Sequence, residues 1–542
     1  MKQQIGGKIV DIHHEMIFEG TIEIENGFIT NIHKHPVNDK GYIIPGFIDS
    51  HVHIESSMLT PHLFGNLAIR KGTIAIVADP HEIANVMGVE GIHFMMDNSK
   101  KSPIKSFFTI PSCVPATPFD VSGGAVSSSD IENMAASRAF VGLSEMMNSV
   151  GVLNGDKEVM EKLHCARKYH LPIDGHAPEL TGKELIEYVN HGINTDHECT
   201  THEEAREKIS AGMKIQLREG SAAKNYGALK ELIRTNPDDI MFCTDDSHPD
   251  EIIEDGHIDK LVRKAIKDGY DLFDVLKIAS VNPVNHYGLD IGLLRIGDKA
   301  DFIIVNNLKQ FHTERVYING IKQYDVQLEN KCKDEDSISP ILFNNFFHDK
   351  IDTSSLRKKV EGEIKIMKLV EDQLLTDIYH YTPQHITDNM ESDPEEDIVK
   401  IVYINRYTNG IPQVAFCKGF QLKKGAFASS IAHDSHNIIG VGCTDDELTE
   451  AVNAIIEQKG GLAVCNANQT TLLPLPIGGI MSDQYGERVA TKYNYLNKLI
   501  SEMGCPLPAP FMTLSFLSLV VIPEIKIGEK GLFSYTDFNW IT

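Results

Sequence analysis

The stretch PGFIDSHVHIESS, residues 45–57, passes from an apolar segment directly into two histidines separated by one residue. The chain has 24 histidines in 542 residues, so chance alone should produce roughly one His-x-His pair. A second pair, His33 and His35, lies in a polar stretch without any further signal. The pair His51 and His53 therefore indicates a function only if the rest of the sequence places other reactive side chains beside it.

The bulk composition is that of an ordinary globular protein with an acidic surface. Apolar residues make up 42% and charged residues 23%, and the formal net charge is −25. An acidic surface argues against nucleic acid and anionic membranes as partners, because both need basic patches. The nine cysteines form no CxxC pair, and we find neither a secretory signal nor an uncharged run of membrane length. We therefore expect a cytoplasmic protein.

The apolar segment before the two histidines is the first of eight runs of strand length. Most are separated by helix-like stretches that end in glycine, as helices often do. Eight strand–helix units over about 250 residues predict a (β/α)8 TIM-like barrel within an α/β fold. The alternative is an open doubly wound sheet, but no phosphate-cradling glycine fingerprint follows the first strand. The runs are YIIPGFID, TIAIVAD, SFFTIP, AFVGLSE, LPIDGH, INTDHE, MKIQLRE and IMFCTDD.

The predicted barrel covers residues 44–290, and the sequence on either side of it has a different pattern of apolar and polar residues. Residues 1–43 and 291–325 alternate between apolar and polar residues and each contain an Asn-Gly pair, a hairpin signal. We expect these two pieces to pair into one small flanking β domain. Residues 326–542 should form a C-terminal α+β domain, beginning with a polar linker at residues 328–340.

One helix of the C-terminal domain is marked at both ends. Thr444 and Glu447 have the spacing of a capping box, and Gly460 is typical of a helix end. The apolar residues between them recur at helical spacing and predict a buried stripe: Leu448, Val452, Ile455 and Ile456.

The barrel prediction gives the two histidines a context. Residues i and i+2 of a strand face the same way, and barrel active sites lie at the C-terminal ends of the strands. The second run leads from Asp79 into His81 and Glu82, and four other runs also end in residues that bind metals. Those residues are Glu145, His176, His197 and Asp245.

So many acids and imidazoles on one rim would repel each other and be costly to desolvate without a cation. Imidazole and carboxylate groups without thiolate suit Mn, Fe(II) or Zn. Four histidines and two carboxylates are too many for one tetrahedral ion. They fit two ions that share a bridging carboxylate and a bridging hydroxide.

Several segments carry a closer resemblance. A His-x-His pair after the first strand, histidines after strands five and six and an aspartate after strand eight are similar to the amidohydrolase superfamily. Within it, the chain resembles the bacterial adenine deaminases along nearly its whole length. The segments that carry this resemblance are PGFIDSHVHIESSMLTP, ADPHEIANVMG, PSCVPATPFD, GLSEMMN, GHAPELTGKEL, TDHE, TDDSHPD and ASSIAHDSHNIIGVG.

The resemblance implies hydrolysis of adenine to hypoxanthine and ammonia, a purine salvage reaction. It implies two divalent metal ions, with Mn or Fe(II) favoured and Zn as an alternative. Six residues would be the metal ligands, with Glu145 in the bridging position: His51, His53, Glu145, His176, His197 and Asp245. Asp245 would move a proton between the attacking hydroxide and the leaving amine, and His81 would assist protonation of the purine ring with Glu82 behind it. The alternative for His81 is a loop residue that caps the following helix.

Other interpretations stay open at this point. The chain could be another metal-dependent amidohydrolase that acts on a cyclic amide or a different aminopurine, and a substrate screen would separate the two. A non-enzymatic barrel that has lost its metal should also have lost ligands, and all six candidates are present. We expect a small-molecule purine as the binding partner and a homo-oligomer, most simply a dimer.

The segment ASSIAHDSHNIIGVG, residues 428–442, belongs to the set that resembles adenine deaminase but lies far from the barrel in sequence. One interpretation is a tight turn, because Asp, Ser and Asn side chains bond to local backbone. Two histidines flanking an aspartate, His433, Asp434 and His436, favour a second interpretation. We predict that this loop packs over or beside the barrel mouth, from its own or a neighbouring chain, and supplies contacts to the purine or a separate metal site.

Overall fold

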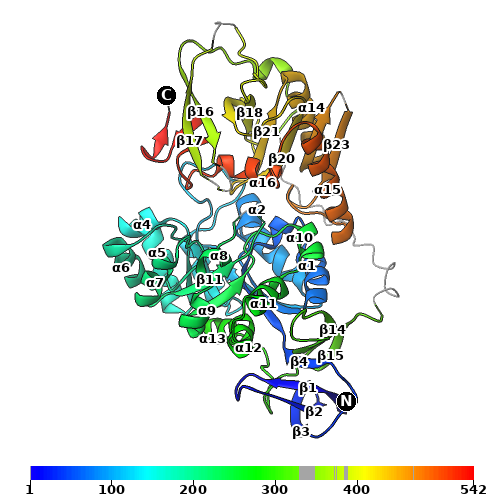
Figure 1. Ribbon diagram of the computed structural model, residues 1–542. Helices are drawn as coiled ribbons and strands as arrows, with labels where there is room; N and C mark the ends of the chain where they lie inside the picture. The colour runs from blue at the N-terminus through cyan, green and yellow to red at the C-terminus, as the bar shows by residue number, and fades with distance from the viewer. Residues whose placement is uncertain are drawn as a thin grey trace.

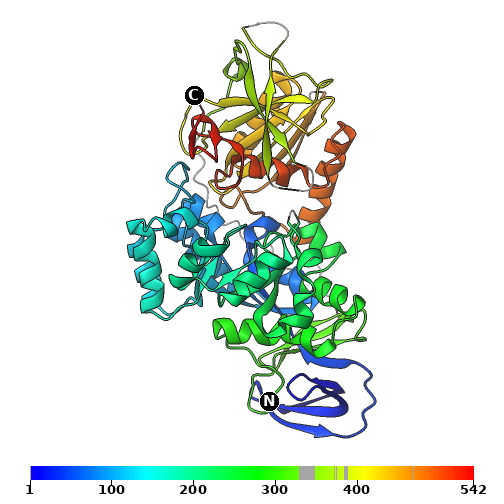
Figure 2. The ribbon, with the colours of Figure 1, turned by 60° about the vertical axis from the view of Figure 1, so that its left-hand side comes forward.

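The computed structural model of the chain has a central barrel between two further β-rich parts (Figure 1). The structure describes residues 2–541 except 222, 329–347, 371–372, 374, 384–387 and 468. The N-terminal strands lie at one end of the molecule and the C-terminal part lies at the other, as a second view also shows (Figure 2). The linker predicted at residues 328–340 falls outside the described residues except for Leu328.

Eight parallel strands in sequence order form the barrel, as the spacing of the apolar runs predicts. They make a five-stranded and a three-stranded sheet, and isolated parallel bridges join Ile173 to Ile193 and Val52 to Asp245 at the two seams. All residues of β6 are buried, because neighbouring strands and helices enclose a parallel sheet on both faces. The strands are β5 (Phe47–Val52), β6 (Thr73–Ala78), β7 (Lys105–Ile110), β8 (Gly142–Met146), β9 (Ile173–Gly175), β10 (Thr195–Asp196), β11 (Lys214–Arg218) and β12 (Ile240–Cys243).

Helices surround the barrel (Figure 1). In α11 the apolar residues Leu261, Val262 and Ala265 are buried, as expected for a helix with one face on the core. The helices are α1 (Pro61–Ala68), α2 (His81–Ser99), α3 (Ser128–Ala136), α4 (Ser149–Leu153), α5 (Lys157–Lys168), α6 (Gly182–Asn190), α7 (His202–Ser210), α8 (Tyr226–Leu229), α9 (Leu232–Thr235), α10 (Pro249–Glu254), α11 (Ile258–Lys267), α12 (Leu272–Leu276) and α13 (Asn282–Tyr287).

A seven-stranded sheet joins segments from both sides of the barrel, in the order β15-β14-β13-β4-β1-β2-β3. Both predicted Asn-Gly hairpins form, and Asn26, Gly27, Asn319 and Gly320 all have the positive φ that a tight hairpin turn needs. The strands are β1 (Lys2–Asp11), β2 (Met16–Glu25), β3 (Phe28–Lys34), β4 (Tyr42–Pro45), β13 (Phe302–Val305), β14 (Thr313–Ile318) and β15 (Ile321–Asp325).

The first apolar run, YIIPGFID, is two strands and not one. Its first half is β4, which pairs with β1 and β13 in the seven-stranded sheet, and its second half is β5 of the barrel. The division falls at Gly46, where an added Cβ would lie 2.4 Å from a side-chain carbon of Ile74. The chain passes between the two sheets at this point because only glycine allows so close an approach.

The C-terminal part is built on an eight-stranded sheet with the order β17-β16-β19-β18-β21-β20-β22-β23. Its helices are α14 (Asp445–Gln458), α15 (Gly486–Glu502) and α16 (Pro510–Ser515). Its strands are β16 (Ile364–Leu369), β17 (Thr376–Tyr381), β18 (Ile398–Ile404), β19 (Gln413–Lys418), β20 (Ala426–Ala432), β21 (Asn437–Gly442), β22 (Gly461–Asn466) and β23 (Gln469–Pro474), followed by a small sheet of β24 (Ile525–Gly528), β25 (Gly531–Ser534) and β26 (Asn539–Trp540).

Helix α14 matches the predicted helix with small differences at its ends. Thr444 is the N-cap and its hydroxyl accepts a hydrogen bond from the backbone N–H of Glu447, and the predicted apolar stripe is buried. In a full capping box the Glu447 carboxylate would accept a hydrogen bond from the backbone N–H of Thr444. Here it accepts one from the Thr444 hydroxyl instead. The helix ends at Gln458, because Lys459 already has a left-handed conformation before Gly460.

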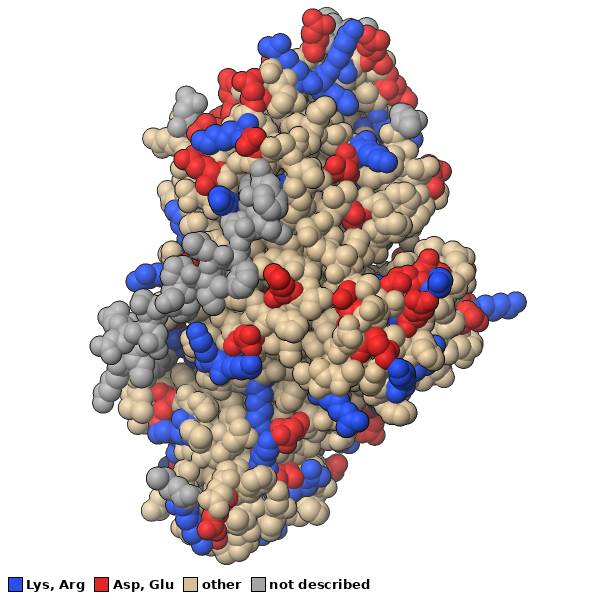
Figure 3. Space-filling model, turned by 180° about the vertical axis from the view of Figure 1, so that it is seen from behind, with Lys and Arg blue, Asp and Glu red and all other residues tan. Residues whose placement is uncertain are grey.

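Basic and acidic side chains are intermixed over the face of the molecule drawn in Figure 3. Among the described residues, none of the helices combines the length and apolarity needed to span a membrane.

Candidate metal centre and active site

The C-terminal ends of the barrel strands bring histidines and carboxylates together around the buried side chain of Glu145. Its Oε1 lies 3.2 Å from Nε2 of His53 and 4.0 Å from Nε2 of His51 at the end of β5. Its Oε2 lies 3.3 Å from Nε2 of His197 and 2.8 Å from Nδ1 of His176. The carboxylate therefore divides the four histidines into two pairs, one facing each oxygen. These five residues and Asp245 are called the Glu145 cluster.

Asp245 lies on the side of His51 and His53. Its Oδ1 is 3.3 Å from Nε2 of His51 and 3.2 Å from Nε2 of His53. Its backbone N–H donates to the carbonyl of His51 at 3.0 Å, and its carbonyl accepts from the N–H of His53 at 3.1 Å. Asp245 has a φ of 58°, which few non-glycine residues adopt, at the seam where β12 meets β5. The closure of the barrel thus fixes Asp245 against both histidines.

Arg218 lies beside Asp245, and Glu198 lies 3.4 Å from Nε2 of His197 on the other side of the mouth; neither was predicted as a site residue. Arg218 donates hydrogen bonds to Oδ2 of Asp245 at 2.6 Å and to Oε1 of Glu198 at 2.5 Å. Burial raises the pKa of Asp245, but the charge of Arg218 and the close contacts with His51 and His53 hold it well below its usual value. Arg218 ends β11, the seventh strand, so the strand-end rule could have identified it; Glu198 directly follows His197.

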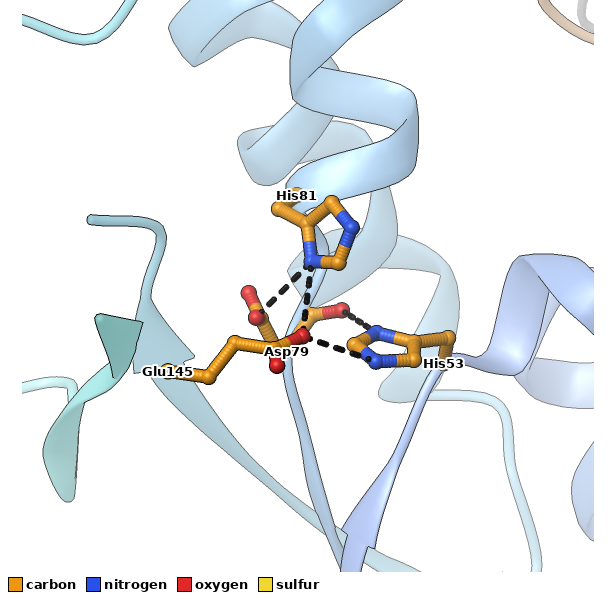
Figure 4. Close-up of side chains that lie close together, drawn as sticks. All are labelled: His53, Asp79, His81 and Glu145. Carbon is orange, nitrogen blue, oxygen red and sulfur yellow. Dashed lines mark hydrogen bonds and ion pairs between the residues drawn. The ribbon is translucent and has the colours of Figure 1, made fainter. Parts of the chain in front are cut away.

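His81 approaches Glu145 from the first turn of α2 (Figure 4). Its Nδ1 lies 2.9 Å from Oδ2 of Asp79 and 3.7 Å from Oε1 of Glu145. Burial lowers the pKa of His81, but the charge of Asp79, its hydrogen bond with Asp79 and the charge of Asp434 together raise the pKa to about 10. The His81 side chain does not cap the helix, since α2 has no side-chain cap bond at its N-terminus. Nδ1 of His53 contacts the carbonyl of Asp79 at 3.1 Å, which orients the ring toward Glu145.

The donor set of the Glu145 cluster fits a divalent metal site. His51 Nε2 and His197 Nδ1 are buried and have no hydrogen-bond partner. His51, His53 and Asp245 each present a ligand atom within 4.8 Å of the others, and so do His51, Glu145 and His197. Nitrogen and oxygen donors without thiolate match the preferences of Zn, Mn and Fe(II). Burial raises the pKa of Glu145, but hydrogen bonds from His176, His197 and His53 together hold the pKa well below its usual value.

A buried ion pair supports the strand ends that carry His176 and His197. Lys208 is fully buried and donates to Oδ2 of Asp196 at 3.0 Å and to the carbonyl of Ala177 at 2.6 Å. Asp196 also accepts a bond from the N–H of Ala177 at 2.9 Å. Because Asp196 precedes His197 and Ala177 follows His176, this pair ties the two histidines to each other.

The turn between β20 and β21 packs at the barrel mouth of the same chain. Oδ2 of Asp434 lies 3.8 Å from Nε2 of His81. Nδ1 of His433 and Nε2 of His436 lie 3.6 Å and 3.9 Å from the two carboxylate oxygens of Glu82. All these side chains are buried. The segment is a tight turn, as one interpretation expected, and its polar residues also meet the first turn of α2, as the other expected.

Two residues that follow the histidines of β5 contact Glu82 and its helix, α2. The hydroxyl of Ser56 lies 2.9 Å from Oε1 of Glu82 and 2.5 Å from Oδ1 of Asp246. Oε1 of Glu55 accepts from the N–H of Ile83 at 3.1 Å. These residues therefore link the first barrel strand to the first turn of α2.

Comparison with known proteins gives matches over nearly the whole chain. A model described as "Amidohydrolase family" matches residues 42–322, and one described as "Adenine deaminase C-terminal domain" matches residues 373–539. The adenine deaminase of Methanosarcina mazei is 46% identical over 549 residues, 99% of this chain and 98% of the relative. The adenine deaminase of a Sulfurovum species is 46% identical over 98% of both chains. Among solved structures, the N-acetyl-D-glucosamine-6-phosphate deacetylase of Mycobacterium smegmatis covers 59% of this chain and 99% of its own, at 13% identity and a TM-score of 0.46.

Proposed function

This chain belongs to the adenine deaminases of the amidohydrolase family, and on that basis we propose that it hydrolyses adenine to hypoxanthine and ammonia. The observation that carries the proposal is the division of the Glu145 carboxylate between two histidine pairs, in a chain similar to adenine deaminases along nearly its full length. The reaction serves purine salvage, because it returns a free base to a form that other enzymes can use.

Two divalent ions are proposed for the Glu145 cluster. One would be held by His51, His53 and Asp245, the other by His176 and His197, with Glu145 shared between them. Mn or Fe(II) is favoured and Zn is the alternative, since all three accept imidazole and carboxylate ligands. Bound divalent ions lower the pKa of water and so supply a nucleophile near neutral pH.

Asp245 is proposed to accept the proton of the attacking water and later to deliver it to the leaving amine. Its Oδ1 faces His51 and His53, while Arg218 holds Oδ2. The charge of Arg218 favours the carboxylate form that the first step requires. Arg218 thus acts as a positioning residue for the proton transfer.

His81 is proposed to assist protonation of the purine ring as the tetrahedral centre forms. Asp79 orients its Nδ1, and Asp434 faces its Nε2 from the C-terminal part. The imidazole of His81 is therefore held between two carboxylates and close to Glu145. The amine-bearing carbon of adenine would have to lie near Glu145 for the water to attack it. Glu82 lies behind His81 on the same turn of α2 and contacts the turn that carries Asp434.

The test is to purify the protein from cells supplied with Mn²⁺, count metal per chain and measure ammonia release. Adenine should be deaminated and adenosine should not. Release from a cyclic amide or another aminopurine, without release from adenine, would favour the alternative amidohydrolase activity. Absence of bound metal together with absence of every activity would favour the non-enzymatic barrel, although the six gathered ligands argue against it.

We further propose that the protein is cytoplasmic and forms a homo-oligomer, with a dimer as the simplest form. The acidic composition and the lack of a CxxC pair support the compartment. Light scattering of the purified protein measures the oligomeric state directly, and a mass of one chain would contradict the proposed dimer.

A further inference from the structure

A second group of metal-type ligands lies outside the Glu145 cluster. It consists of Glu82 from the first turn of α2 and of His433 and His436 from the turn between β20 and β21. Their exposed fractions are 1%, 3% and 0%, respectively. The three side chains are called the Glu82 cluster. Each presents a ligand atom within 4.8 Å of the other two.

The distances in the Glu82 cluster do not match hydrogen bonds. Nδ1 of His433 lies 3.6 Å from Oε1 of Glu82, and Nε2 of His436 lies 3.9 Å from Oε2 of Glu82. Hydrogen bonds between nitrogen and oxygen are shorter, at about 2.7–3.2 Å. Ligands bound tetrahedrally at about 2.1 Å from Zn²⁺ are about 3.4 Å apart. The observed separations are therefore closer to those of ligands around a shared ion.

The polar atoms of the cluster are also left without partners. Both ring nitrogens of His436 and Oε2 of Glu82 are buried and have no hydrogen bond. Burying such groups without a partner costs free energy, and a carboxylate costs more than a neutral group. A cation placed between the three side chains would satisfy Oε2 and one nitrogen of His436 together.

The surroundings add negative charge that the protein does not neutralise by hydrogen bonding. The hydroxyl of Ser56 lies within hydrogen-bond distance of both Glu82 and Asp246. A hydroxyl has one hydrogen and can donate to only one of these carboxylates at a time. Asp434 adds a further carboxylate, with one oxygen 3.6 Å from Nδ1 of His433 and the other 3.8 Å from Nε2 of His81, so the excess rests on Glu82 and Asp246. An additional cation would offset this excess.

We propose that Glu82, His433 and His436 bind a third divalent cation, separate from the ions of the Glu145 cluster. Two imidazoles, one carboxylate and a free fourth position suit Zn²⁺ in tetrahedral geometry. The ion would join the C-terminal part to the first turn of α2 across about 350 residues of sequence. It would thereby hold Asp434 in place against His81. The site does not depend on which substrate the barrel uses.

The direct test is anomalous diffraction at the zinc edge from crystals of the full-length protein soaked in Zn²⁺. A peak between Glu82, His433 and His436 is expected, in addition to density at the Glu145 cluster. A peak at the Glu82 cluster alone would support this inference while contradicting the proposed metal pair. Absence of any peak between these three side chains would overturn the inference.

Metal counting in variants provides a second test. After loading with Zn²⁺ and removal of free ions, the unaltered protein should hold three ions per chain, and Glu82→Gln and His436→Ala should each hold two. His286→Ala is the matched control, because His286 has an unpartnered Nε2 but lies outside both clusters, and it should hold three. Equal metal content in the unaltered protein and in folded Glu82→Gln, with circular dichroism as the check on folding, would overturn the inference.

Discussion

The Glu145 cluster and the Glu82 cluster use the same residue types but are assembled in different ways. The first takes every candidate ligand from the strand ends of one barrel, and the buried side chains of Lys208 and Arg218 hold those ends by hydrogen bonds. The second joins a helix of the barrel to a turn from the C-terminal part. A site built on one rigid scaffold can position reacting groups, whereas a site that joins two parts can fix one part over the other.

The largest effect should follow from Glu145→Gln, which acts on the centre of the first cluster. An amide is a poor bridge between two cations, so metal content should fall and ammonia release from adenine should drop to background. Elemental analysis should also show that one ion is lost more readily than the other. Glu203→Gln, on the exposed first turn of α7, is the control and should behave as the unaltered protein. Full activity of Glu145→Gln, or of unaltered protein with one ion per chain, would contradict a shared carboxylate.

Lys208→Met should lower stability more than any exposed change. It leaves Asp196 and Glu204 buried without their cation, a loss that costs about 3–5 kcal/mol. Burial raises the pKa of Asp196, but the charges of Lys208 and His197 and the hydrogen bonds to the carboxylate together hold the pKa below its usual value of 3.8. The stabilisation from this pair is therefore present above pH 3.8 and is lost as the pH falls below it.

Chemical denaturation at neutral pH measures the effect of Lys208→Met. The control is Lys230→Met, because Lys230 forms a comparable pair with Asp268 on the surface and should cost at most about 1 kcal/mol. Equal losses in the two variants would show that the buried pair does not brace the histidine strand ends.

Asp245→Asn should reduce kcat by at least about 10²-fold, the low end for general acid–base catalysis. The amide can neither accept the proton of water nor return it to the amine. Metal content must be measured on the same sample, since Asp245 is also a proposed ligand. Near-normal turnover with the metals retained would assign the proton transfer to another group, and His81 would be the next to test.

The smallest effect should come from Asp434→Asn, which tests the contribution of the C-terminal turn to the first cluster. It removes a negative charge 3.8 Å from Nε2 of His81 and should lower kcat/KM about tenfold, the lower end for losing a charged contact. The metals of the Glu145 cluster should remain. Asp446→Asn, on the exposed start of α14, is the control. Unchanged kcat/KM in Asp434→Asn would mean that the turn covers the mouth without acting on His81.

Much of the barrel site was predictable because local sequence patterns indicate both the strands and the residues at their ends. Parallel strands buried on both faces appear as short apolar runs, and their ends meet on one rim. His51, His53, Glu145, His176 and His197 can therefore be grouped from their positions in the chain alone. Arg218 also ends a strand, but a guanidinium does not bind metal ions, so a pattern of metal-ligand types does not select it. Glu198 is the last residue of the run INTDHE, but it was missed because His197 directly before it was taken as the ligand of that strand end.

Other features depended on where distant segments meet. The run YIIPGFID is divided between two sheets because β4 pairs with β1 and β13, and no local pattern shows which partners a strand will choose. The contact between Glu82 and His433 likewise depends on how the C-terminal sheet sits against α2.

The sequence by itself determined the barrel, the flanking hairpins and the candidate ligands at the strand ends, because their periodicity, turn residues and positions are local properties of the chain. Only the tertiary structure decided that Glu145 divides its oxygens between two histidine pairs and that the 433–436 turn meets Glu82. The physical reason is that contacts between remote residues arise from packing of whole elements, which local periodicity does not specify.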